Sequence, residues 1–322
     1  ILKFNLNTSI FVNGALTIGD GDGLGTQTVL TSFRDIDLAS GANITDGLAA
    51  AVRGNWGQIQ VNNGATVNID RALIKYADYG LYQVNTQPAV ATTVTNTDIE
   101  STDFYGININ TSTGQGITLN LDNITFTDIG RNVSYHGIYV FAGVNSTFTG
   151  TWTSLTMNIV RGSGIYIDDD SSGVVNPTIS GLTMGSIGEY GIRLEGSSTT
   201  TPIFTSTSGV NTINGGIYNL YIDGASGAYA HLTLENATTS SIYFRNNSLP
   251  LAWDIPTVIL DNSPSPYTLI GMNLPAPVGY TIGPAVALVE DYVRVGGSMT
   301  GDMTLNADPL GVESLVVPLR AA

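Results

Sequence analysis

The sequence predicts an all-β fold, a parallel β-helix in which each coil of the chain supplies one strand to each of two or three sheets. Hydrophobic residues make up 42% of the 322-residue chain, whereas charged residues make up only 11%. Surface polarity therefore comes from Gly, Asn, Ser and Thr, which suit turns and pleated strands. A strand phrase that recurs along the chain, with no helical period between its copies, completes the prediction.

The recurring phrase is a small residue followed by Ile or Leu, any residue, and a second aliphatic residue. Clear and near copies begin at Ile59, Leu81, Ile107, Ile138, Ile165, Ile192, Leu220 and Ile242, with spacings of 22, 26, 31, 27, 27, 28 and 22 residues. These spacings are typical of repeat architectures, and the chain length corresponds to about a dozen coils. Because side chains alternate along a strand, Ile165 and Ile167 should point inward and Tyr166 outward. The alternative, a β-sandwich, would return its strands about every 8–12 residues through hairpin turns.

One stretch of the chain carries a family resemblance. GNWGQIQVNNGATVNIDRALIKYADYG (54–80) resembles a coil that recurs in the right-handed parallel β-helix family of secreted and surface proteins. VLTSFRD (29–35) resembles the segment that usually precedes this coil. The resemblance implies a right-handed β-helix. It implies little about function, because adhesins, tail fibres, surface-layer proteins and polysaccharide-cleaving enzymes share the fold.

The two ends of the chain are similar to each other. IFVNGALT (10–17) matches VRVGGSMT (293–300), with Val12 on Val295. Either this is similarity between coils of one β-helix, or the chain is one period of a longer array of modules.

The second interpretation suggests two parts. We expect residues 1–250 to form the β-helix, and residues 251–322 to form a Pro-containing connecting segment and the start of a further set of coils. The phrase GGSMTGDMTLNADP (296–309) is also similar to one found in phage tail fibres, so a tail fibre is an alternative.

Charge and composition exclude several classes of protein. The formal net charge is −15 with 11 basic residues, so we expect no nucleic-acid partner, because nucleic-acid binding needs clustered Lys and Arg. Without a run of about 18 apolar residues, we expect no membrane insertion. The absence of Cys excludes a disulfide framework and thiol catalysis. The chain opens without Met, which suggests a mature or excerpted segment.

Two acidic segments are candidates for calcium, the one cofactor that the sequence suggests. The metal candidates are Asp20 and Asp22 in IGDGDGLG, and Asp168, Asp169 and Asp170 in YIDDDSSG. Closely spaced carboxylates beside backbone carbonyls suit the oxygen preference of Ca²⁺. The alternative for each segment is a solvated acidic turn.

An enzyme is the competing class of function. Glu195 follows Asp168 by 27 residues, so these carboxylates could stack on neighbouring coils, as in a glycosidase. A polysaccharide lyase would also need a base, and Lys is nearly absent while Arg is scattered. Stacked carboxylates also occur without catalysis, so we assign no catalytic residue and expect a non-enzyme.

Aromatic residues accompany the strand phrase. Outward tyrosines are expected at Tyr82, Tyr139, Tyr166, Tyr218 and Tyr243. Such a series stacks on sugars or simply stabilises a sheet, and the sequence favours the structural role. His136 replaces a repeat tyrosine and is expected to be a packed substitute.

Sequons and fold class together favour an exported protein. The candidate glycosylation sites are Asn7, Asn43, Asn110, Asn123, Asn132, Asn145, Asn236 and Asn246. We therefore expect an extracellular or cell-surface protein with a structural or adhesive role, as a module of a filament, fibre or surface layer. We expect the protein to associate with itself, either end to end with other copies or through further modules of the same chain. Surface glycans are the other expected partner.

Overall fold

The computed structural model describes most of the chain up to residue 245 and only strands beyond it. The described residues are 1–19, 25–35, 50–85, 90–169, 172–196, 200–223, 225, 228–229, 232–238 and 240–245, followed by the strands between 252 and 316. Every regular element in them is a β-strand, and the strand pairs among them are parallel. The predicted all-β parallel solenoid is confirmed. Among these residues no helix is long and apolar enough to span a membrane.

The strands form two sheets. The 12-stranded sheet contains β2 (Ile10–Val12), β5 (Ile59–Val61), β8 (Leu81–Asn85), β10 (Ile107–Thr111), β12 (Ile138–Ala142), β14 (Ile165–Asp169), β17 (Tyr190–Glu195), β20 (Tyr218–Asp223), β23 (Ser240–Arg245), β26 (Tyr267–Ile270), β28 (Tyr292–Gly296) and β29 (Ser314–Val316). The 17-stranded sheet contains β1 (Leu2–Phe4), β3 (Ala15–Ile18), β4 (Thr28–Ser32), β6 (Thr66–Asp70), β7 (Ala72–Lys75), β9 (Val90–Glu100), β11 (Gly116–Thr127), β13 (Thr147–Met157), β15 (Val174–Ser180), β16 (Thr183–Ile187), β18 (Ile203–Thr205), β19 (Asn211–Gly215), β21 (Ala228–Tyr229), β22 (Leu232–Glu235), β24 (Ala252–Trp253), β25 (Val258–Asp261) and β27 (Thr281–Ile282).

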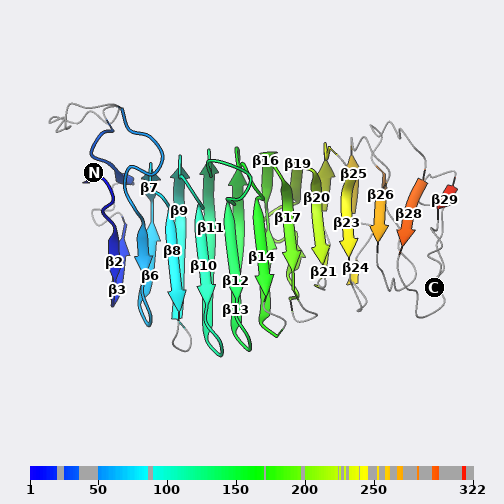
Figure 1. Ribbon diagram of the computed structural model, residues 1–322, viewed down its shortest axis with the longest axis horizontal. Coiled ribbons are helices and arrows are strands. Elements are labelled where there is room, and N and C mark those ends of the chain that lie inside the picture. The colour runs from blue at the N-terminus through cyan, green and yellow to red at the C-terminus, as the bar shows by residue number, and fades with distance from the viewer. Residues whose placement is uncertain are drawn as a thin grey trace.

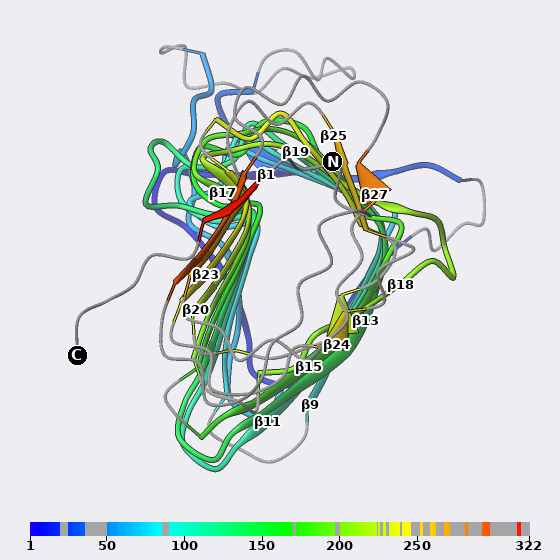
Figure 2. The same ribbon diagram turned by 90° about the vertical axis from the view of Figure 1, so that its right-hand side faces the viewer.

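The coils follow one another along a single axis. Figure 1 shows strands of the 12-stranded sheet side by side in chain order, and the view along the axis in Figure 2 shows the two sheets enclosing a common interior. Strand alternation fills that interior, since β14 has a buried–half-buried–buried pattern with Ile165 and Ile167 fully enclosed and Tyr166 on the outer side. The predicted orientation of these three side chains is therefore confirmed.

The core consists of stacked aliphatic columns with large aromatic residues between them. Ile138, Ile165 and Ile192 occupy one column through consecutive pairings. The largest fully buried side chains include Trp56, Trp152, Phe126 and Phe148. Each aliphatic side chain removed from water stabilises the fold by roughly 1.5–3 kcal/mol, so the columns stabilise the stack along its whole length.

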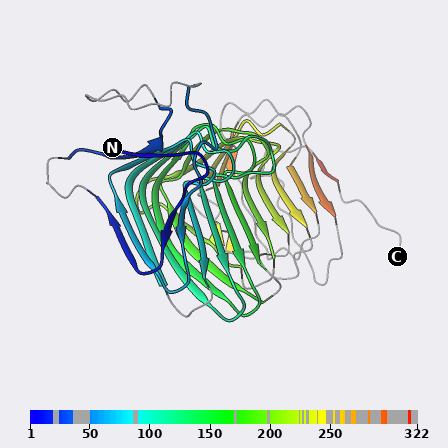
Figure 3. The same ribbon diagram turned by 60° about the vertical axis from the view of Figure 1, so that its left-hand side comes forward.

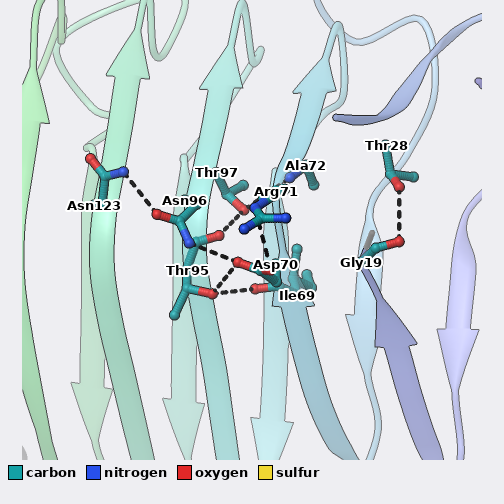
Figure 4. A network of polar contacts seen from close by, with 10 residues as sticks. All are labelled: Gly19, Thr28, Ile69, Asp70, Arg71, Ala72, Thr95, Asn96, Thr97 and Asn123. Atoms are coloured by element: carbon teal, nitrogen blue, oxygen red, sulfur yellow. Dashed lines mark hydrogen bonds and ion pairs between the residues drawn. The ribbon is translucent and has the colours of Figure 1, made fainter. Parts of the chain in front are cut away.

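The 17-stranded sheet bends at a row of left-handed residues. Asn96 (φ 48°) and Asn123 (φ 54°) lie beside each other in β9 and β11, where Asn tolerates this conformation better than most residues. The amide of Asn123 donates to Asn96 Oδ1 (2.9 Å), and the amide of Asn96 donates to Asp70 Oδ1 (2.8 Å). Thr95 adds a hydrogen bond of 2.7 Å to the same carboxylate oxygen (Figure 4). This side-chain ladder holds the bend in register from coil to coil.

The solenoid has about seven turns, fewer than the dozen expected from chain length. The recurring strand phrase covers the stretch between β5 and β23. Before it, the chain runs from Ile10 to Ile59 for one step of the 12-stranded sheet, almost twice the usual spacing. The eight copies of the phrase from β5 to β23 are joined by seven steps from coil to coil, which form the regular part of the solenoid. Dividing the whole length by the mean spacing also counts the stretches outside this part.

The last described strands join the same two sheets. β25 pairs with β22, β26 with β23, and β28 with β26. The division of the chain near residue 250 stays a prediction.

Candidate functional site

The outer surface of the 12-stranded sheet carries a column of aromatic side chains. Consecutive pairings place Tyr139, Tyr166, Arg193, Tyr221 and Tyr243 at one register position on β12, β14, β17, β20 and β23. We call these five residues the tyrosine column. Tyr218 was expected in this series but lies three residues earlier on β20, opposite Tyr190 of β17. It contacts the column from the side, with its ring centroid 4.9 Å from that of Tyr243.

Arg193 stands where the column would otherwise have a tyrosine. Its guanidinium lies 4.3 Å from the Tyr166 ring centroid and 5.8 Å from that of Tyr221, within the range of cation–π attraction. It also donates to Glu195 Oε1 (2.8 Å) and lies 3.9 Å from a carboxylate oxygen of Glu189. Arg193 therefore links the aromatic residues of the column to two carboxylates.

Asp168 and Glu195 are register partners on β14 and β17, as the spacing of 27 residues predicts. Both carboxylates are already engaged. The Tyr166 hydroxyl donates to Glu195 (2.6 Å), and the Tyr139 hydroxyl donates to Asp168 (3.4 Å). Burial, followed by repulsion from Glu195, raises the pKa of Asp168 above its usual value.

His136 is a buried neutral imidazole beside the column. The Ser163 amide donates to its Nδ1 (2.9 Å), which leaves the ring proton on Nε2. Burial, with the nearby Arg193 charge, lowers the pKa of His136 to about 3. Its ring meets Tyr166 edge-on at 5.1 Å, so His136 packs as an aromatic residue, as expected, and also offers one N–H donor.

A hollow of about 320 Å³ opens next to these groups. Its lining residues are Tyr105, Val133, Ser134, His136, Tyr139, Tyr166, Glu189 and Arg193. Val133 is 56% exposed at its rim, in the segment that connects the bend of one coil to β12. The hollow therefore combines aromatic walls, one guanidinium, one carboxylate and one neutral imidazole.

The structure separates the predicted acidic triplet. Asp168 lies on the outer face of β14, whereas Asp169 is 5% exposed on the inner side, where the Thr200 hydroxyl donates to it. Asp20, Asp22 and Asp170 lie outside the described residues. Among those that are described, no three His, Asp or Glu side chains gather as metal donors. Calcium binding at these segments stays a prediction.

The sequons fall in different surroundings. Asn7, Asn132, Asn145 and Asn236 are exposed, and Asn110 is half-buried within β10. Asn123 is exposed, but its amide is part of the ladder with Asn96. Asn43 and Asn246 lie outside the described residues. Glycosylation of these sites stays a prediction.

A second group of charges lies at the corner that follows β7, β9 and β11. Arg53 and Arg161, far apart in sequence, both pair with Asp128, the second at 3.0 Å. Burial, with repulsion from Asp103, raises the pKa of Asp78 to about 6. The coiling of the chain thus brings arginines that are far apart in the sequence to the same carboxylate.

Sequence reasoning missed Arg193 and Glu189 as members of a site. The available signal was the phrase GIRL, in which Arg stands where GIYV, GIYI and SIYF have Tyr. A charged residue in an otherwise aromatic column marks a position that the strand preference of aromatic residues does not explain.

Comparison of the chain with protein-family models, curated proteins and solved structures finds no match.

Proposed function

We propose that this chain is a structural module of an extracellular repetitive assembly, in which solenoid units continue one another end to end. The observation that carries the proposal is the equivalence of the two similar segments. Successive pairings from β2 to β28 place Val12 and Val295 at the same register position of the 12-stranded sheet. The proposed neighbour of β2 is therefore the C-terminal coil of another unit with this sequence.

The side of β2 that faces away from β5 has backbone groups that would bind such a neighbour. Ile10 donates its amide hydrogen to Gln58 O (2.9 Å), and the Asn62 amide donates to Val12 O (2.9 Å). Successive residues of a parallel strand direct their amide groups to opposite sides. The N–H and C=O of Phe11 therefore face away from β5, and unpaired strand edges readily accept a further strand. Figure 3 turns this first coil, in blue, toward the viewer.

Sedimentation velocity and negative-stain microscopy of the purified chain test the proposal. We expect concentration-dependent linear particles that lengthen in steps of one unit. Only monomers over a wide concentration range would contradict the proposal. Closed trimers would favour the tail-fibre alternative instead.

Phe11→Pro sharpens this test. Proline removes the outward amide hydrogen without removing a hydrogen bond to β5, and it is tolerated at a sheet edge. We expect this variant to remain folded and monomeric. Phe11→Thr, which keeps the amide hydrogen, is the matched control and should still associate.

A polysaccharide-cleaving enzyme is the second candidate, favoured by the register pair Asp168 and Glu195. Neighbouring strands lie about 4.8 Å apart, which is near the carboxyl separation of about 5–5.5 Å in retaining glycosidases. The test is product formation from acidic and neutral glycans by the purified chain. Turnover that is lost in both Asp168→Asn and Glu195→Gln would support the enzyme and overturn the purely structural role.

A further inference from the structure

We propose that the hollow beside the tyrosine column binds one or two residues of a neutral glycan, whose chain continues along that column. This inference goes beyond the end-to-end module and does not depend on it. It rests on the shape of the hollow, the mixture of groups that line it, the local charge and the continuity of the column.

The size and walls of the hollow suit a small polyhydroxylated ligand. Its volume of about 320 Å³ lies at the lower end of the range for small-molecule sites. Tyr139 and Tyr166 are half-buried, with ring centroids 5.1 Å apart and planes inclined by 48°. Rings inclined in this way leave part of their apolar surface open, and the C–H faces of sugars pack on such surfaces.

Residues that donate and residues that accept hydrogen bonds both line the hollow. His136 Nε2 and the Arg193 guanidinium are donors, while the Glu189 carboxylate is an acceptor. Sugar hydroxyls both donate and accept hydrogen bonds, so neighbouring hydroxyls match such a mixed set. A simple cation or anion would match only half of it.

The donors and acceptors are also held in place. Arg193 is fixed by Glu195 Oε1 at 2.8 Å, and the Ser163 amide fixes His136 at 2.9 Å. Groups that are ordered before binding lose little conformational entropy when the ligand arrives. The hollow is therefore lined by donors that are already ordered before a ligand binds.

Charge selects against acidic polysaccharides. The carboxylates of Glu189 and Glu195 pair with the one guanidinium, that of Asp168 lies beside Glu195 in the sheet, and the whole chain carries a net charge of −15. An anionic glycan would be repelled, so the structure favours a neutral one.

The column extends the site along the solenoid axis. Aromatic contacts continue on one side through Tyr105 to Tyr79 (5.7 Å) and on the other from Tyr221 to Tyr243 (5.1 Å). The step of about 4.8 Å between strands is close to the length of one sugar residue in an extended chain. Longer oligosaccharides should therefore make more contacts and bind more tightly.

Isothermal titration calorimetry tests the proposal with cellohexaose, chitohexaose and mannohexaose as neutral probes, and hexagalacturonate as the acidic probe. We expect at least one neutral hexasaccharide to bind with a Kd below about 1 mM, and more tightly than its disaccharide. We expect hexagalacturonate to bind more weakly.

Two variants locate the site. Glu189→Gln keeps the shape of the side chain, and Tyr139→Val keeps a residue that suits strands; each should weaken binding by about tenfold. The matched control is Thr156→Val on the 17-stranded sheet, which should bind as the wild type does. Circular dichroism and unfolding midpoints establish that each variant is folded.

Several outcomes would overturn the proposal. They are no binding of any neutral hexasaccharide below about 10 mM, binding unchanged in both Glu189→Gln and Tyr139→Val, or preference for hexagalacturonate. Phe11→Pro separates this proposal from the module function, because a variant that no longer associates should still bind the neutral probe.

Discussion

Two outward columns on the same solenoid differ in a way that separates scaffold from candidate site. On the 17-stranded sheet, consecutive pairings align Thr125, Thr156, Thr183, Thr212 and Thr233, which we call the threonine column. On the 12-stranded sheet, the tyrosine column is interrupted by Arg193 and flanked by carboxylates. Both columns cover the same core, so both satisfy the needs of a pleated surface. The strand preference of Thr explains the uniform column, whereas the irregular column holds Arg193 together with Glu189 and Glu195, charged side chains that stabilise one another.

The largest expected effect is the loss of unfolding free energy when a buried side chain is truncated. This loss should be similar for residues beneath the two columns. Ile167 lies under the tyrosine column and Leu155 under the threonine column, and both are fully buried. Either Ile167→Ala or Leu155→Ala should lower the free energy of unfolding by about 3 kcal/mol, from lost burial and the cavity left behind. Urea unfolding followed by circular dichroism measures this. A loss below about 1 kcal/mol in either variant would contradict full burial of that side chain in a common core.

Removing the charge from the tyrosine column should have the next largest effect. Arg193→Met leaves Glu195 and Glu189 partly buried without their cation, and we expect a loss of about 2 kcal/mol in unfolding free energy. Arg71→Met is the control, because Arg71 is exposed and lies 3.9 Å from Asp70, and its loss should be below about 0.5 kcal/mol. Equal losses for both would remove the distinction that we draw for Arg193.

At a corner away from both columns, the ionisation of Asp78 should make the stability of the fold depend on pH. Asp78 has a pKa raised from 3.8 to about 6, so the folded state holds its proton more tightly than the unfolded state does. Stability should therefore fall as pH rises between 3.8 and about 6, and the full loss should be present above that window.

Asp78→Asn should remove this loss. After allowance for solvent screening of a half-exposed group, we expect a gain of about 1 kcal/mol at neutral pH. Thermal unfolding midpoints across the pH range provide the measurement. Variant and wild type should converge near pH 4, and a constant offset at every pH would contradict the ionisation argument.

The smallest expected effect belongs to the threonine column. Thr183→Val replaces an exposed residue by one of similar shape and strand preference, so unfolding free energy should change by less than about 0.5 kcal/mol. Tyr166→Val should cost more, about 1–2 kcal/mol, because it removes aromatic contacts and the 2.6 Å hydrogen bond to Glu195. Parallel unfolding curves test the contrast, and similar losses would make the two columns equivalent.

The sequence by itself determined the parallel solenoid and the inward or outward direction of its repeat residues. The alternation of side chains along a strand and the coil spacing near 27 residues can both be read directly from the sequence. The inward direction of Ile165 and Ile167 and the outward direction of Tyr166 could therefore be predicted correctly. The same spacing predicted that Asp168 and Glu195 would be register partners.

Only the tertiary structure decided which residues meet across coils of unequal length. It put Tyr221 rather than Tyr218 in the tyrosine column, turned Asp169 away from Asp168, and brought Arg53 to Asp128. Register between coils depends on where bends and insertions take up extra residues, and local sequence does not fix those positions. The hollow beside Arg193 depends on the same packing, because its walls come from several different coils.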